Sequence, residues 1–128
     1  MHKDFDSWNN QKKSIHSDGE NKFYHSREMW WCSLGVNVGF EQDGTGEENQ
    51  RPVLILKGFN KNVCLIVPLT TSHKKNIYNI SVGVVDKKKA FAIISQIRLI
   101  DTKRLANKIG MLDKTQFETI KKAVKDLI

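Results

Sequence analysis

Two apolar runs of strand length stand at the centre of the sequence, Arg51-Pro52-Val53-Leu54-Ile55-Leu56 and Val63-Cys64-Leu65-Ile66-Val67-Pro68-Leu69-Thr70-Thr71-Ser72. Segments that are rich in Val, Ile and Leu and bounded by turn residues are typical of β-strands. Residues 58–62 lie between the runs and carry one glycine and two asparagines. We therefore expect an antiparallel hairpin with a short loop rather than a two-residue turn.

Chemically useful side chains meet at one end of this hairpin. Arg51 enters the first strand, and Thr70, Thr71 and Ser72 leave the second. Arginine offers a planar fork of donors that fits a phosphate, and hydroxyls can donate to the same oxygens. The sequence therefore predicts a phosphodiester site here, with the alternative that Thr71 and Ser72 only cap the end of the strand.

The rest of the chain is predicted to be mainly β. Further strands are expected over residues 28–34, 78–84 and 90–97. Asp101 or Thr102 is expected to begin a short helix that ends at Gly110, and Asp113 to cap a final helix. Few strands joined by short hairpins must curl to hide their edges, so a small, partly open barrel is expected.

Two adjacent tryptophans, Trp30 and Trp31, fall within the first of these strands. Neighbouring side chains of a strand point to opposite faces. One tryptophan is therefore expected in the core, and the other in a binding groove or a dimer contact.

Length and composition fit one cytoplasmic domain. The chain has 128 residues, a polar N-terminus and no apolar run near the ~20 residues that span a bilayer, so no membrane partner is expected. Cys32 and Cys64 sit among apolar neighbours, which predicts buried, reduced thiols. Neither has a partner at metal-ligand spacing, so no zinc site and no other cofactor is expected.

The net charge of +7 is concentrated in the last third of the chain, where residues from Lys87 onward include 11 basic and 4 acidic side chains. A basic excess favours polyanionic partners such as nucleic acid. The alternative is that lysines such as Lys121, Lys122 and Lys125 only solvate the final helix.

Four short motifs occur in one order along the chain: GFEQDGTGEENQRP, RPVLIL, VPLTTS and AIISQIRLIDTKRL. Together they resemble the MazF/PemK family of toxin endoribonucleases. The resemblance implies a toxin domain over residues 27–128. Polar residues dominate residues 1–26, and this composition predicts a polar extension before the domain. It further implies an SH3-like barrel of the MazF/PemK/CcdB type that forms a two-fold homodimer.

The resemblance also implies an activity. It is that of a sequence-specific, metal-independent endoribonuclease that cleaves single-stranded RNA to 2′,3′-cyclic phosphate and 5′-hydroxyl ends. Such a protein is the toxin of a type II toxin–antitoxin system, and its partner is a cognate antitoxin. An alternative on the same fold is a non-catalytic binding module or a toxin that targets DNA gyrase.

Metal-free RNA cleavage needs a base, an acid and donors for the phosphorane charge. Arg51 is the candidate for charge stabilisation, since its guanidinium stays protonated. Thr70 matches the family's catalytic threonine and would donate to a non-bridging oxygen. Glu41 resembles the glutamate of the family's loop motif and is the candidate base, while His73 is the competing acid or base.

The residues expected to bind RNA are Thr71, Ser72, His73, Lys74, Gln96 and Arg98. Gln96 and Arg98 match the family's Gln-Ile-Arg segment, and alternation along a strand would place both on one face. They would read bases or sugars, or Arg98 would instead pair with Asp101. Ser95 and Ile93 stand where some PemK members carry an acidic residue and an arginine, so that acid–base pair is not expected here.

Overall fold

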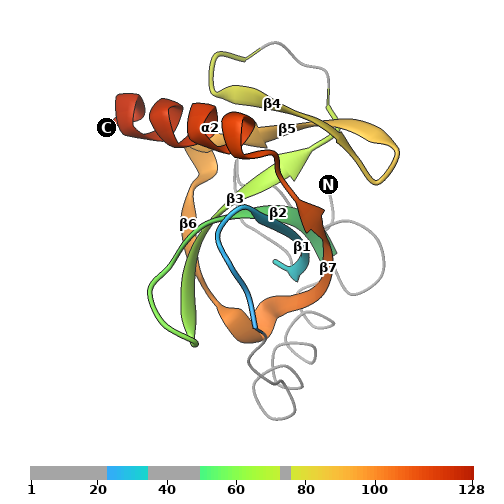
Figure 1. Cartoon of the computed structure of the whole chain (residues 1–128), viewed down its shortest axis with the longest axis vertical. Helices are drawn as coiled ribbons and strands as arrows, with labels where there is room; N and C mark the ends of the chain where they lie inside the picture. The colour runs from blue at the N-terminus through green and yellow to red at the C-terminus, as the bar shows by residue number, and fades with distance from the viewer. Residues whose placement is uncertain (1–22, 35–49, 73–75) are drawn as a thin grey trace, which may run out of the picture.

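The computed structural model describes residues 23–34, 50–72 and 76–128. These residues form one seven-stranded antiparallel sheet that curls into a half-barrel, with a C-terminal helix packed on it (Figure 1). The strands are β1 (Glu28–Ser33), β2 (Gln50–Gly58), β3 (Val63–Thr70), β4 (Asn79–Val85), β5 (Lys88–Ile93), β6 (Arg98–Asp101) and β7 (Leu105–Met111). The remaining elements are the 3₁₀ turns η2 (Ile94–Gln96) and η3 (Thr102–Arg104) and the helix α2 (Lys114–Leu127). The expected mainly β, partly open SH3-like barrel is confirmed.

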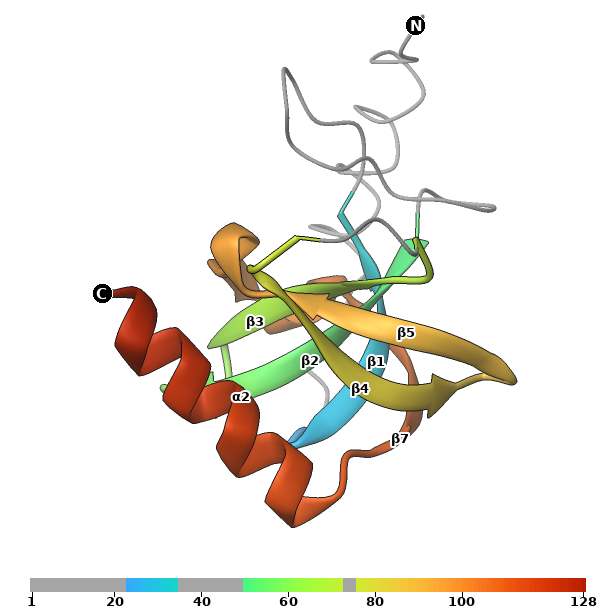
Figure 2. The same ribbon diagram turned by 90° about the horizontal axis from the view of Figure 1, so that it is seen from above.

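Strand β3 is the centre of the sheet, whose order is β4-β5-β3-β2-β1-β7. One edge of β3 pairs with β2. The other edge is shared, because residues 63–66 pair with β6 and residues 69–70 pair with β5. The chain passes from β5 to β6 through η2, and the β4–β5 hairpin extends from the end of β3 (Figure 2). This division of one edge between two strands bends the sheet.

The predicted hairpin is confirmed as β2 and β3, which pair in antiparallel register with Val53 opposite Pro68. Both of its faces are buried, which explains why its sequence is continuously apolar instead of alternating. Leu54 and Val67 belong to one core cluster, whereas Val53 and Ile66 belong to a second cluster on the other face.

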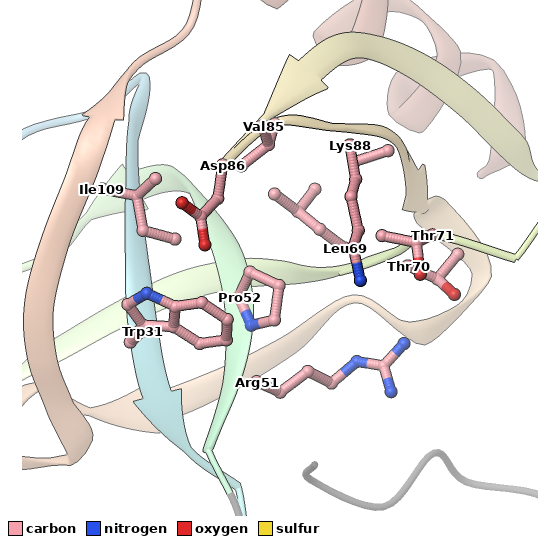
Figure 3. Close-up of a pocket in the computed structure, with 11 residues that line it drawn as sticks. Trp31, Arg51, Pro52, Leu69, Thr70, Thr71, Val85, Asp86, Lys88 and Ile109 are labelled. Atoms are coloured by element: carbon pink, nitrogen blue, oxygen red, sulfur yellow. The ribbon is translucent and has the colours of Figure 1, made fainter. Parts of the chain in front are cut away.

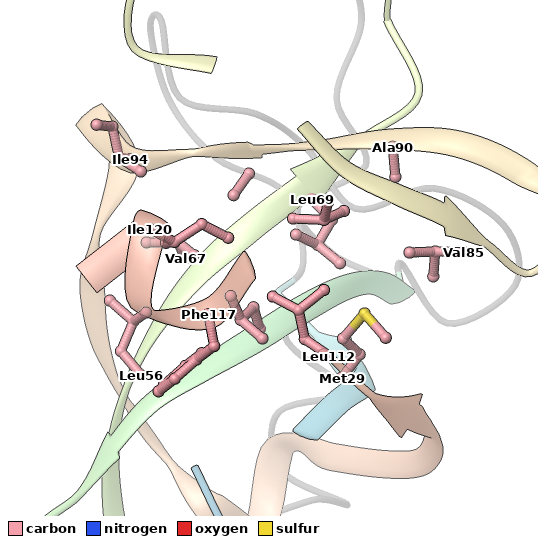
Figure 4. Packing of buried hydrophobic residues seen from close by; sticks show 13 residues of the cluster. Met29, Leu56, Val67, Leu69, Val85, Ala90, Ile94, Leu112, Phe117 and Ile120 are labelled. Carbon is pink, nitrogen blue, oxygen red and sulfur yellow. The ribbon is translucent and has the colours of Figure 1, made fainter. Parts of the chain in front are cut away.

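Helix α2 closes the first core cluster, which Figure 4 shows. Phe117 and Ile120 are buried and point toward Leu56 and Val67 (Figure 4). The side chain of Asp113 accepts hydrogen bonds from the backbone N–H groups of Thr115 and Gln116, as expected of an N-cap. Within the part of the chain that the structure describes, no helix is both long and apolar enough to cross a membrane.

The predicted short helix from Asp101 or Thr102 to Gly110 is wrong. Asp101 does act as a cap, because its side chain accepts from the Lys103 N–H at 2.8 Å, but it caps only the single turn η3. Residues 105–111 then form β7, which pairs with the free edge of β1, and Leu105 enters the second core cluster. Pairing with a neighbouring strand therefore overrides the local helix signals.

The predicted strand over residues 90–97 is also inaccurate, and the barrel has seven strands where five were expected. Strand β5 begins at Lys88 and ends at Ile93, Gln96 lies in η2, and Arg98 begins β6. A turn separates Gln96 from Arg98, so strand alternation does not relate their side chains.

Burial confirms that one of the two tryptophans lies in the core and that both cysteines are buried. Trp30 is buried in the second core cluster, whereas Trp31 is half-buried. Cys32 and Cys64 are free thiols without solvent exposure. Burial raises the pKa of Cys32 to about 12 and that of Cys64 to about 11, so both remain protonated at neutral pH.

Candidate active site

A pocket of about 230 Å³ lies where the β2–β3 hairpin meets the turn between β4 and β5 (Figure 3). Its wall combines side chains from both hairpins with Trp31 of β1. The polar and aromatic residues that line it are Trp31, Arg51, Thr70, Thr71, Asp86 and Lys88.

The hairpin brings Arg51 and Thr70 into the same pocket, as their positions at the two strand ends predict. The register places Val53 opposite Pro68, so the start of β2 and the end of β3 reach the same edge of the barrel. In Figure 3 the Arg51 guanidinium extends toward the strand end that carries Thr70 and Thr71. An arginine and two hydroxyl-bearing residues therefore share one wall of the pocket.

Arg51 is unusually buried for an arginine, with an exposed fraction of 4%. Burial lowers the pKa of its guanidinium, because the charged form loses hydration. A guanidinium nevertheless stays protonated in proteins, so the pocket carries a fixed positive charge. Charges interact more strongly where solvent is excluded, which makes this wall well suited to an anion.

The Thr70 hydroxyl is held by the backbone. Its Oγ1 accepts a hydrogen bond from the Ser72 N–H at 3.1 Å. A hydroxyl has one donor and two acceptor positions, so this contact orients Oγ1 while leaving its hydrogen for an acceptor in the pocket. Thr71 is exposed and lines the same pocket. Ser72 does not line it, but its backbone N–H holds the Thr70 hydroxyl.

Two other predicted site residues, Gln96 and Arg98, do not line this pocket. Gln96 lies in η2 and Arg98 in β6, where Arg98 pairs with Ile66 in the middle of β3. Asp101, the alternative partner of Arg98, uses its side chain to cap η3. Glu41, His73 and Lys74 lie outside the described residues, so their roles stay predictions.

Sequence reasoning missed two residues of the pocket, Asp86 and Lys88. Both fall between the strands that the sequence predicts over residues 78–84 and 90–97. The strand instead begins at Lys88, which pairs with Val85 across a two-residue turn. The signal for this turn is weak, because its central residues are Asp86 and Lys87 instead of the asparagine and glycine that such turns favour.

The sequence of residues 25–128 matches a family described as the PemK-like, MazF-like toxin of type II toxin–antitoxin systems. No curated protein matches the chain. Among solved structures, MazF from Deinococcus radiodurans is similar with a TM-score of 0.70 and 16% identity, over 83% of this chain and 96% of that one.

Two mycobacterial structures are also similar. The Mycobacterium tuberculosis toxin MazF-mt6 has a TM-score of 0.61 and 18% identity, over 78% of this chain and 94% of that one. An endoribonuclease from a mycobacterial species, solved in complex with its cognate antitoxin, has a TM-score of 0.60 and 15% identity, over 81% and 93%. At these identities the structures show a common fold.

Proposed function

Because the chain belongs to the PemK-like, MazF-like toxin family of type II toxin–antitoxin systems, we propose that it is a metal-independent endoribonuclease that cleaves single-stranded RNA at specific sequences. The observation that carries this proposal is the meeting of Arg51 and Thr70 in one pocket. A buried cation beside an oriented hydroxyl suits a phosphodiester whose negative charge increases during cleavage.

RNA supplies its own nucleophile for this reaction. The 2′-oxygen attacks the adjacent phosphorus while a base takes its proton, and the bond from phosphorus to the 5′-oxygen breaks as an acid protonates the leaving oxygen. The products are a 2′,3′-cyclic phosphate and a 5′-hydroxyl. Arg51 offsets the charge of the phosphorane, and Thr70 donates a hydrogen bond to a non-bridging oxygen.

The proton transfers are assigned to residues of the neighbouring segments. Glu41 is the proposed base, and His73 is the competing acid or base. Thr71, Ser72, His73, Lys74, Gln96 and Arg98 are the proposed RNA contacts. Single-stranded RNA is the preferred form, because its unstacked bases expose the edges that a protein reads.

The proposed partners follow from the family. We expect a homodimer that acts in the cytoplasm on messenger RNA and is neutralised by a cognate antitoxin. A mycobacterial relative was solved with its cognate antitoxin, which supports a partner of this type. No membrane partner is proposed.

The test is incubation of the purified protein with a long single-stranded RNA in EDTA, followed by mapping of the new ends. We expect discrete cuts that leave 2′,3′-cyclic phosphate and 5′-hydroxyl ends, and that are absent with Arg51→Ala. Intact RNA across every short motif would reject the nuclease and favour the binding module or gyrase-targeting toxin.

A further inference from the structure

Three consecutive lysines, Lys87, Lys88 and Lys89, occupy the β4–β5 hairpin, and Lys88 alone among them lines the pocket. The pairing of the two strands explains this difference. Lys88 lies opposite Val85, which is buried and also lines the pocket. Lys89 lies opposite Val84, which is 67% exposed. Lys88 thus shares the inner face of the hairpin, and Lys89 shares the outer face.

The inner position of Lys88 is reinforced by the residues that follow it on β5. Ala90 and Ala92 are buried in the first core cluster, and alternation places Lys88 on the same face of the strand. Ala90 also lines the pocket, beside Lys88. Figure 3 shows the Lys88 side chain descending from β5 with its ammonium group directed toward the wall formed by Arg51 and Thr70.

The turn before Lys88 fixes where its side chain starts. Asp86 and Lys87 both adopt positive φ angles, 49° and 71°, as the two central residues of a tight hairpin turn require. This conformation is costly for residues other than glycine, asparagine and aspartate, so the pairing of the strands holds it in place. Lys88 is therefore presented from an ordered strand and not from a loop.

The acidic and basic side chains of the pocket lie on different sides of it. Asp86 lies on the side of Trp31 and Ile109, whereas the ammonium of Lys88 lies on the side of Arg51 and Thr70 (Figure 3). An anion would be repelled at the first side and attracted at the second. The second side is the one that carries the oriented Thr70 hydroxyl.

We propose that Lys88 is a second cation at the scissile phosphate, which it holds together with Arg51. This inference rests on the proposed ribonuclease function and adds to it a residue from the β4–β5 hairpin. The phosphate enters with one negative charge, and the phosphorane formed by attack of the 2′-oxygen carries additional charge. Lys88 donates to a non-bridging oxygen throughout, so its attraction increases as the phosphorane forms.

The experiment compares Lys88→Gln with the matched variant Lys89→Gln, which removes the same charge from the next residue of the strand. Rates are measured on an RNA with one cleavage site. We expect kcat/KM to fall about 10- to 100-fold for Lys88→Gln, the usual strength of a charged hydrogen bond, and to change less than about twofold for Lys89→Gln. Lys88→Arg should recover part of the loss, because it restores the charge.

A binding measurement provides a readout that a structural role would not change. The RNA carries a 2′-O-methyl group at the cleaved nucleotide, so it binds without being cut. The slope of log Kd against log salt should be smaller by about 0.7 for Lys88→Gln than for the wild type, as expected for one lost phosphate contact to a single strand. Lys89→Gln should keep the wild-type slope.

The outcomes separate this inference from the proposed function. If the wild type cleaves, Arg51→Ala does not, and Lys88→Gln behaves like Lys89→Gln in both rate and salt dependence, then the inference is wrong and the ribonuclease stands. If the wild type does not cleave RNA, the proposed function itself is wrong. A Lys88→Gln loss that Lys88→Arg does not relieve would also overturn the inference, since charge would not be what the site needs.

Discussion

The β2–β3 hairpin and the segment from Ile94 to Met111 differ in how well their local sequence predicts their structure. In the hairpin, the apolar runs are buried on both faces by two core clusters, so the composition alone identifies the strands. In the later segment, Asp101 and Gly110 resemble helix boundaries, yet the chain forms η2, β6, η3 and β7. The difference is that β6 and β7 complete edges supplied by β3 and β1. Their conformation depends on strands distant in sequence.

The largest stability effect should come from the hairpin. Ile55 of β2 has no solvent exposure, and Ile55→Ala should lower the free energy of unfolding by about 2–5 kcal/mol through lost burial and a cavity. Ile109→Ala in the half-buried β7 should cost clearly less. Urea denaturation of both variants measures the contrast, and equal losses would show that β7 is as important to the core as the hairpin.

A smaller loss of unfolding free energy is expected from a substitution between β1 and β7. The Glu28 carboxylate is buried and lies 2.8 Å from the Lys108 ammonium, and it also accepts from the Trp30 indole N–H at 3.0 Å. Glu28→Gln should cost about 1–3 kcal/mol, because a charged hydrogen bond is lost while its donors remain. Glu118→Gln on the exposed face of α2 is the control, and a Glu28→Gln loss no larger than this control would reject the role of the ion pair.

The same pair predicts a pH dependence. Burial opposes ionisation of Glu28, but hydrogen bonds from Lys108, Trp30 and the His25 backbone N–H outweigh it and lower its pKa. The unfolded chain therefore binds this proton more readily than the folded chain, so the contribution is present above the ordinary glutamate pKa and is lost as the pH falls through the lowered one. Unfolding measured against pH should show a shallower acid loss in Glu28→Gln, and parallel curves would contradict this assignment.

The smallest stability effects are expected at Asp113 and Asp101, two aspartates that the sequence predicts to cap a helix. Asp113 accepts from two N–H groups at the start of α2, and Asp113→Ala should cost about 1 kcal/mol. Asp101 caps a single 3₁₀ turn, so Asp101→Ala should cost about half as much or less. Urea midpoints measure both, and a greater loss at Asp101 would mean that η3 is more important than its length suggests.

These contrasts show how far the sequence can be read. The sequence predicts that Arg51 and Thr70 lie close together, because the start of the first strand of a hairpin lies beside the end of the second. Gln96 and Arg98 could not be placed from the sequence, because η2 turns the chain between two strands that share one edge of β3. Lys88 was missed because its turn uses Asp86 and Lys87, and only the pairing with Val85 reveals which lysine faces inward.

We propose that RNA is cleaved in the pocket at the end of the β2–β3 hairpin. This location is tested by the single-turnover cleavage rates of Arg51→Ala and Arg98→Ala on the same RNA in EDTA. Loss of a cation that stabilises transition-state charge should slow Arg51→Ala by about 10³-fold or more, while Arg98→Ala, outside the pocket, should lose about 100-fold or less. Near-wild-type cleavage by a folded Arg51→Ala protein would contradict this proposal and place the chemistry elsewhere on the barrel.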